Sequence, residues 1–249
     1  EAQYWIWSNE IDFGYYSKPP LLAWVINFFT FFLGSGFVAL KSIPLIIYLF
    51  TSYLVFLLSY ELFKNKSLSA SLAVSFYLMP VVTVSSFLIS TDIILIFFWT
   101  MSLLLLLKIR NNPKLINFAL LGIFLGMAFM AKYAAIYFLL SLIAILFFDL
   151  KLREVFVKKI QNTLTFISST VLILLPNIFW NINNNWITLT HTSDNAALNR
   201  INFNFLHGLE FILIQGLMLG PLLLIISFFV FKKISFNFET KFLLCFSLP

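Results

Sequence analysis

The strongest constraint on this chain is a succession of apolar runs of membrane-spanning length, separated by short polar loops. A transmembrane helix needs about 20 apolar residues, because the hydrocarbon core of a bilayer is about 30 Å thick. Hydrophobic residues make up 61% of the 249 residues and charged residues only 10%. A single core surrounded by water could not bury that much apolar surface. The sequence therefore predicts an all-α, polytopic integral membrane protein, with residues 1–249 forming one helical bundle.

Spanning helices are predicted where these runs approach 20 residues. We expect about seven, with an eighth beginning near Phe242, and they lie at about residues 43–63, 68–89, 93–107, 115–131, 134–148, 163–181 and 208–231. The apolar run at 21–34 is too short to cross, and the connection at 35–42 is too short and too apolar for an ordinary loop. We therefore expect an interfacial helix at 21–34. Because no Met opens the sequence and an apolar run is cut at Pro249, we expect a fragment lacking an N-terminal helix and a C-terminal part.

Basic residues alternate between the loops in a way that predicts orientation. Lys and Arg in short loops are retained on the cytoplasmic side of a membrane. Twelve of the 16 lie in alternate loops, namely Lys64, Lys66, Lys108, Arg110, Lys114, Lys151, Arg153, Lys158, Lys159, Lys232, Lys233 and Lys241. The other four are Lys18, Lys41, Lys132 and Arg200. The opening loop, the turn 90–92 and the loop 183–204 are thus predicted to face the periplasm or exterior from the inner (plasma) membrane. The net charge of +6 has this topological meaning, so nucleic acid is not an expected partner.

The chemistry-bearing residues gather at this outer face. Residues 1–21 combine acids, aromatics, one Lys and a Pro-Pro break. Polar groups placed against hydrocarbon are costly, so such a cluster is a functional-site candidate. The ionisable residues Asp92, Lys132 and Glu210 lie near outer helix ends, whereas an ion-coupled transporter would place such groups near the midplane. The sequence predicts a site at the outer interface.

Several motifs in the outer segments resemble a known family. The opening segment reads Glu1-Ala2-x-Tyr4-Trp5, then Gly14-Tyr15-Tyr16 and Lys18-Pro19-Pro20-Leu21. Further motifs are Thr91-Asp92 before Leu95-Ile96-Phe97-Phe98-Trp99, Gly126-Met127-Ala128-x-x-x-Ala131-Lys132-Tyr133 and Pro176-Asn177-x-x-Trp180-Asn181. This order resembles the polyprenyl-phosphate-sugar-dependent glycosyltransferases of the GT-C type. That group includes dolichyl-phosphate-mannose protein mannosyltransferases and bacterial lipid A aminoarabinose transferases, and the resemblance runs from residue 1 to about 195.

The resemblance implies a membrane-embedded enzyme that moves a sugar from a polyprenyl-phosphate donor to a lipid, glycan or protein acceptor. Glu1 matches the second member of the family's Asp-Glu pair, and we expect the catalytic Asp just upstream of it. Asp92 matches the second acidic position, so Asp92 and Glu1 are the candidate catalytic residues here. A carboxylate can accept or orient the acceptor proton while the phosphate leaves.

The resemblance also suggests substrate contacts. Lys18 matches the family's phosphate-contacting Lys. A cation at this position would offset the negative charge of the leaving phosphate. Tyr15 and Tyr16 could hydrogen-bond the same phosphate. His191 and Arg200, in the third outer segment, are further candidates for contacts with the donor lipid.

One departure concerns metal binding. Some relatives use an acidic residue directly before the Lys, together with a His, to bind a divalent metal, but Ser17 stands at that position. His191 alone defines no metal site, so we predict none, and a divalent cofactor is left open.

Each candidate also has a simpler interpretation. Asp92 could cap free backbone N–H groups at a helix start, and Lys18 could be an interfacial side chain that reaches towards water. The aromatic residues could form a membrane-interface belt. Lys132 is interpreted as marking a helix end, and Gly122-x-x-x-Gly126 as a helix-packing motif.

Two other functions therefore stay open. One is a lipid flippase or transporter that binds the same polyprenyl-linked lipid without transferase chemistry. The other is a noncatalytic family member or assembly subunit.

Overall fold

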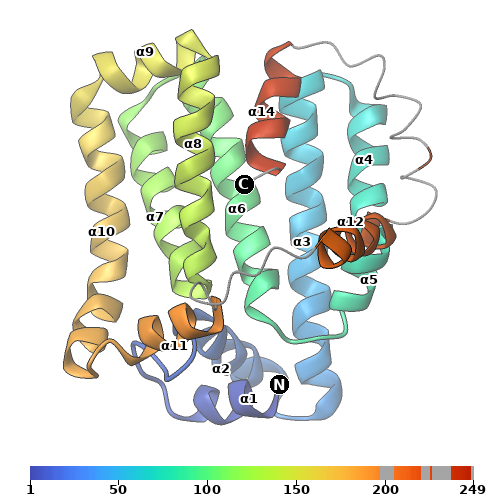
Figure 1. The fold of residues 1–249 in the computed structure, drawn as a ribbon, viewed down its shortest axis with the longest axis vertical. Coiled ribbons are helices and arrows are strands. Elements are labelled where there is room, and N and C mark those ends of the chain that lie inside the picture. Colours follow the sequence, from blue (N-terminus) through green and yellow to red (C-terminus); the bar gives the residue numbers. More distant parts are fainter. Residues whose placement is uncertain (197–204, 220–224, 226–236, 248–249) are drawn as a thin grey trace.

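The computed structural model describes residues 1–196, 205–219, 225 and 237–247, and every regular element in these ranges is helical. The elements are α1 (Ala2–Asn9), α2 (Leu21–Leu33), α3 (Phe37–Phe63), α4 (Lys66–Leu78), α5 (Pro80–Ser85), α6 (Thr91–Asn111), α7 (Leu115–Ala131), the 3-10 turn η1 (Tyr133–Ala135), α8 (Ile136–Phe148), α9 (Leu150–Lys158), α10 (Ile160–Asn183), α11 (Ile187–Ala196), α12 (Phe205–Leu219) and α14 (Phe238–Ser247). The long helices run side by side as one bundle (Figure 1). The predicted all-α class is confirmed for the part of the chain that is described.

Three of the described helices, α3, α6 and α10, are long and apolar enough to cross a membrane. A fourth span results if the bent pair of residues 133–148 and 150–158 is counted as one. The helix α7 is apolar but has 17 residues. The expected number of seven spans is therefore not confirmed, and of the predicted span at 208–231 only residues 208–219, within α12, and residue 225 are described.

The predicted span at 68–89 is not one straight helix. It is divided into α4 and α5 at Met79, whose backbone is extended, and Pro80 opens α5. Proline removes a backbone donor and disfavours helical geometry at the residue before it, so Met79-Pro80 ends one helix and begins the next.

The helix α3 begins earlier than expected and takes in most of the connection at 35–42. It starts at Phe37 after a tight turn, with Gly34 at φ 78° closing α2 and Gly36 preceding α3. A positive φ is readily available to glycine, so the chain can change direction within three residues. The helix α2 covers the apolar run at 21–34, and its interfacial position stays a prediction.

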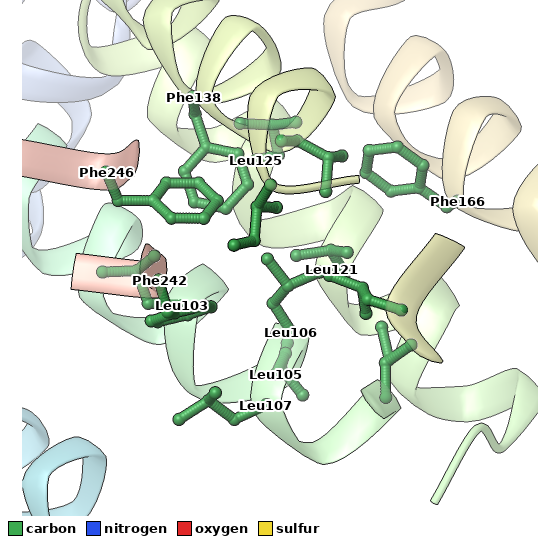
Figure 2. Packing of buried hydrophobic residues seen from close by; sticks show 14 of the residues in the cluster. Leu103, Leu105, Leu106, Leu107, Leu121, Leu125, Phe138, Phe166, Phe242 and Phe246 are labelled. Carbon is green, nitrogen blue, oxygen red and sulfur yellow. The ribbon is translucent and has the colours of Figure 1, made fainter. Parts of the chain in front are cut away.

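The largest part of the core lies between α6, α7, α8 and α14. It includes Leu106, Leu121, Phe138 and Phe242, all fully buried. Figure 2 shows the leucines of α6 and α7 meeting the phenylalanine rings of α8 and α14. This apolar packing fixes the middle of the bundle and thereby the relative positions of the helix ends.

Helices α7 and α10 approach closely along the Gly122-x-x-x-Gly126 motif. A Cβ on Gly122 would overlap the Phe166 carbonyl oxygen, and one on Gly126 would lie 2.7 Å from Ile173 Cβ. The predicted helix-packing role of this motif is confirmed, since only a residue without a side chain leaves room for the neighbouring helix.

The two ends of the bundle differ in composition. The basic loops around Lys64, Lys108 and Lys151 lie at the end where α9 crosses the bundle, at the top of Figure 1. The helices α1, α2 and α11 and the start of α6 lie together at the opposite end. The three segments predicted to share one face therefore share one end of the bundle.

Candidate functional site

The opening loop is organised around Tyr15, which is 7% exposed. Its ring stacks on Trp7, with the centroids 4.7 Å apart. Its hydroxyl lies 2.9 Å from the carbonyl oxygens of Trp7 and Glu10 and accepts a hydrogen bond from the Asp12 N–H. Burial, followed by the charges of Asp12 and Glu10, raises the pKa of Tyr15 despite that hydrogen bond. Tyr15 thus holds the loop to α1 with its side chain.

Helix α10 holds the same loop from the other side. The Asn177 amide donates to the Phe13 carbonyl at 2.7 Å, and the Trp180 indole N–H donates to Asp12 Oδ2 at 2.6 Å. Gly14 lies against the Trp180 ring so closely that a Cβ there would overlap it. Pro176-Asn177-x-x-Trp180-Asn181 therefore acts on the opening loop by direct contact.

Lys18 and Lys132 line one cleft of about 320 Å³. Its other lining residues are Ser17, Pro19, Tyr133, Ala134, Ile136, Tyr137 and Thr192. Lys18 forms no ion pair within the described residues, and its charge gives the cleft a positive potential suited to an anionic ligand. The cleft joins the opening loop, the α7–α8 junction and α11, which lie far apart in the sequence.

Asp92 is tied to this cleft through Lys132. The Lys132 Nζ lies 2.6 Å from Asp92 Oδ1, and the two side chains are 35% and 52% exposed, respectively. Asp92 lies in the first turn of α6, whose N-cap is Ser90. Burial, and after it the negative charge of Asp92, raises the pKa of Tyr4 in α1. Asp92 therefore lies beside both the cleft and the opening segment.

Glu1 makes a separate ion pair at the same end of the bundle. Lys41 Nζ donates to both carboxylate oxygens of Glu1, at 2.8 and 2.7 Å, and to the Phe87 carbonyl at 3.0 Å. The Ile89 N–H donates to Glu1 Oε1 at 2.8 Å. Burial raises the pKa of Glu1, but the hydrogen bonds from Lys41 and Ile89 and the Lys41 charge outweigh it, so the pKa lies below its ordinary value. Glu1 thereby connects α1 to the segment that leads into Asp92.

The remaining candidates differ in their surroundings. Tyr16 is 55% exposed, and its ring centroid lies 4.9 Å from that of His191 in α11. His191 also contacts the Asn195 amide, 3.1 Å from Nδ1. The Tyr15 hydroxyl is engaged within its own loop, and Arg200 lies outside the described residues. Substrate contact by these four residues stays a prediction.

A metal site would need several His, Cys, Asp or Glu side chains close together in the described ranges. Within them, no three or more His, Cys, Asp or Glu side chains are grouped as a metal site would require.

Comparison with known proteins gives two matches. A family model described as dolichyl-phosphate-mannose-protein mannosyltransferase matches residues 17–180, well over half of the chain. The chain belongs to this family. It is also 30% identical over 228 residues to the lipid A galacturonosyltransferase RgtD of Rhizobium johnstonii. That alignment covers 90% of this chain and 46% of the relative, so the chain spans about half the relative's length. No solved structure matches.

These matches confirm the resemblance to this family, and the family model covers the segments around Lys18, Asp92, Lys132 and Trp180. Family membership accounts for the matched motifs. The structure adds two residues to the candidate site that the sequence analysis used mainly to predict membrane orientation. Lys132 and Lys41 each bind an acidic residue about forty positions away. For Lys132, the sequence feature that could have indicated a role in the site was its place in the Ala131-Lys132-Tyr133 motif. For Lys41, the only such feature was its position among the few basic residues predicted on the outer side.

Proposed function

We propose that this chain forms the transferase site of a membrane glycosyltransferase that takes its sugar from a polyprenyl-phosphate donor. The observation that carries the proposal is the cleft shared by Lys18 and Lys132, with Asp92 bound to Lys132 beside it. A site of this kind offers cations for a phosphate and a carboxylate for a hydroxyl within one region. Membership of the mannosyltransferase family and the similarity to a lipid A galacturonosyltransferase support the same class of reaction.

In the proposed reaction, an acceptor oxygen attacks the anomeric carbon of the donor sugar. The bond between that carbon and the phosphate oxygen breaks, and the bonding electrons leave with the phosphate. Lys18 and Lys132 offset the negative charge that develops on it. The acceptor proton passes to a carboxylate. A single displacement inverts the configuration at the anomeric carbon.

The two candidate carboxylates are suited to different parts of this reaction. Asp92 is 52% exposed beside the cleft, so it is open to an acceptor hydroxyl. Both oxygens of Glu1 accept hydrogen bonds from Lys41, and one also accepts from Ile89. We therefore assign orientation or deprotonation of the acceptor to Asp92, and positioning of the α1–α6 region to Glu1.

The proposed site faces the periplasm or exterior of the inner membrane. The supporting observation is that the basic loops occupy the opposite end of the bundle, which the distribution of Lys and Arg predicts to be cytoplasmic. The acceptor would be a lipid, glycan or protein that presents a hydroxyl at the outer surface.

The test uses the full-length protein in membranes with a radiolabelled polyprenyl-phosphate sugar. Label transferred to lipid, glycan and protein fractions is compared for wild type, Asp92→Asn and Lys18→Ala. The control is Lys66→Ala, which removes a lysine from the opposite end of the bundle. We expect transfer to be lost in the first two variants and retained in the control, at equal protein levels.

The same experiment distinguishes the alternative function. If wild type binds or translocates the lipid but transfers no label to any fraction, the glycosyltransferase proposal fails and a transporter replaces it. If Asp92→Asn and Lys18→Ala transfer as well as wild type, the assignment of the cleft is wrong.

A further inference from the structure

The short helix α9 turns sharply away from the bundle axis. Residues 133–148 and 150–158 meet at an angle of 109°, and α9 lies across the end of the bundle in Figure 1. Asp149 stands at the bend, where its Oδ1 accepts a hydrogen bond from the Leu152 N–H and so caps α9. If the long helices cross the membrane, α9 runs close to the membrane plane at this end.

The bend is held by contacts with other helices. Asp149 Oδ2 accepts a hydrogen bond from Arg110 Nε of α6 at 2.6 Å, and the Asp149 side chain is only 7% exposed. Leu152 is fully buried and Phe156 is 5% exposed, and both belong to the main core. One face of α9 is therefore packed against the bundle, which fixes the direction of the opposite face.

The exposed positions of α9 combine basic and aliphatic side chains with one acidic residue, Glu154. Lys151, Arg153 and Lys158 are exposed, and Leu150 and Val157 are 61% and 69% exposed. Lys158 pairs with Glu154 at 2.8 Å, but neither Lys151 nor Arg153 forms an ion pair within the described part of the chain. An aliphatic surface fixed beside cations is costly in water and costly in hydrocarbon. It is stable at the boundary between them, where long basic side chains reach the headgroups.

We propose that α9 is an interfacial helix that binds anionic phospholipid headgroups of the adjacent leaflet. Lys151 and Arg153 bind the headgroup phosphates, with a smaller contribution from Lys158 because it is paired with Glu154, while Leu150 and Val157 insert among the upper acyl carbons. Charge complementarity selects an anionic over a zwitterionic lipid, because each basic side chain at a membrane surface is attracted to negative lipid. This inference rests on α9 alone and does not depend on the proposed transferase chemistry.

The test measures lipid selectivity of the full-length protein. Purified protein is exposed to equal amounts of phosphatidylglycerol and phosphatidylcholine in mixed micelles, and the bound lipids are counted by native mass spectrometry. The variant Lys151→Gln/Arg153→Gln/Lys158→Gln removes the cations. Lys151 and Arg153 are each expected to contribute about five-fold to the selectivity, equivalent to about 1 kcal/mol, and Lys158 less because Glu154 offsets its charge,. We therefore expect the triple variant to lose most of the preference for phosphatidylglycerol.

Two controls distinguish binding by α9 from a general effect of the positive charge at this end of the bundle. Lys64→Gln/Lys66→Gln removes two lysines from the α3–α4 loop and should leave the preference within about two-fold of wild type. Lys151→Arg/Lys158→Arg keeps the charge and should also retain it. The proposal is overturned if the triple variant keeps the preference or if the Lys64/Lys66 variant loses it equally.

A measurement on wild type covers the case in which the triple variant does not fold. Raising the salt concentration should weaken selectivity, because headgroup attraction is screened over about 10 Å at 0.1 M salt. A preference that is absent, or that is insensitive to salt, contradicts the proposal.

Discussion

Replacing Asp92 with Asn should abolish sugar transfer while leaving the fold almost unchanged. The Asp92–Lys132 pair has a 2.6 Å contact, but its side chains are 52% and 35% exposed. An exposed ion pair contributes about 0.2–1 kcal/mol, and a carboxylate in the first turn of a helix adds about 0.3–1 kcal/mol. After allowance for solvent screening, we expect Asp92→Asn to lower the free energy of unfolding by about 1 kcal/mol. This corresponds to a fall in Tm of about 2–4 °C.

The expected loss of transfer is much larger. Proton transfer by a positioned side chain typically contributes about 100-fold to 10,000-fold to a rate. A stability loss of about 1 kcal/mol changes the unfolding equilibrium about five-fold, which leaves nearly all of a stable protein folded. A 100-fold fall in transfer by Asp92→Asn could therefore not arise from unfolding.

The assay combines thermal unfolding of the full-length protein with transfer from the labelled donor. The control is Glu61→Gln at the other end of the bundle, where Glu61 pairs with the neighbouring Lys64 at 2.7 Å and accepts a hydrogen bond from Asn111 of α6 at 3.2 Å. Glu61→Gln should cost similar stability and leave transfer intact. The reasoning is refuted if Asp92→Asn retains more than about a tenth of the transfer. It is also refuted if the variant lowers stability by more than about 3 kcal/mol, the range of a buried broken pair.

Two further predictions concern stability. Because the folded-state pKa of Glu1 lies below its ordinary value of 4.5, its ion pair with Lys41 should stabilise the protein fully above that value and lose this effect as pH falls through the folded pKa. Thermal unfolding of Glu1→Gln should depend less on pH between about 5 and 3 than wild type, and an unchanged slope would contradict this. In α7, Gly122→Ala should cost about 1–3 kcal/mol, because its Cβ meets the Phe166 backbone,. A Cβ on Gly208 would have nothing within 4 Å, so Gly208→Ala should raise the free energy of unfolding by up to about 1 kcal/mol. Equal Tm shifts for the two variants would show that close packing at Gly122 does not determine the effect.

The alternation of basic loops was the most informative sequence signal for the arrangement of the site. It predicted that the opening loop, the turn at Asp92 and the segment at His191 lie together, and they do share one end of the bundle. The prediction succeeds because Lys and Arg in short loops are retained on one side of the membrane, whatever contacts their side chains make.

Contacts between distant residues could not be predicted in the same way. Lys41 was interpreted by its position and Lys132 as part of a family motif at a helix end, yet each is bound to a carboxylate on another element. Pairing of this kind depends on helix rotation and packing, which hydropathy does not specify. The division between α4 and α5 was also missed, although Met79-Pro80 carries a local signal for it,.

The anchors of the opening loop reach its backbone from other parts of the chain. Trp24, Asn177 and Thr188 donate to the carbonyl oxygens of Asp12, Phe13 and Tyr15, respectively. Every residue type supplies a carbonyl oxygen, so exposed side chains of the loop other than Asp12, whose carboxylate accepts from Trp180, can be exchanged while the path of the loop is kept. If the proposed function is correct, the loop can be diversified in the laboratory to select variants with altered donor preference, with the anchoring residues kept constant.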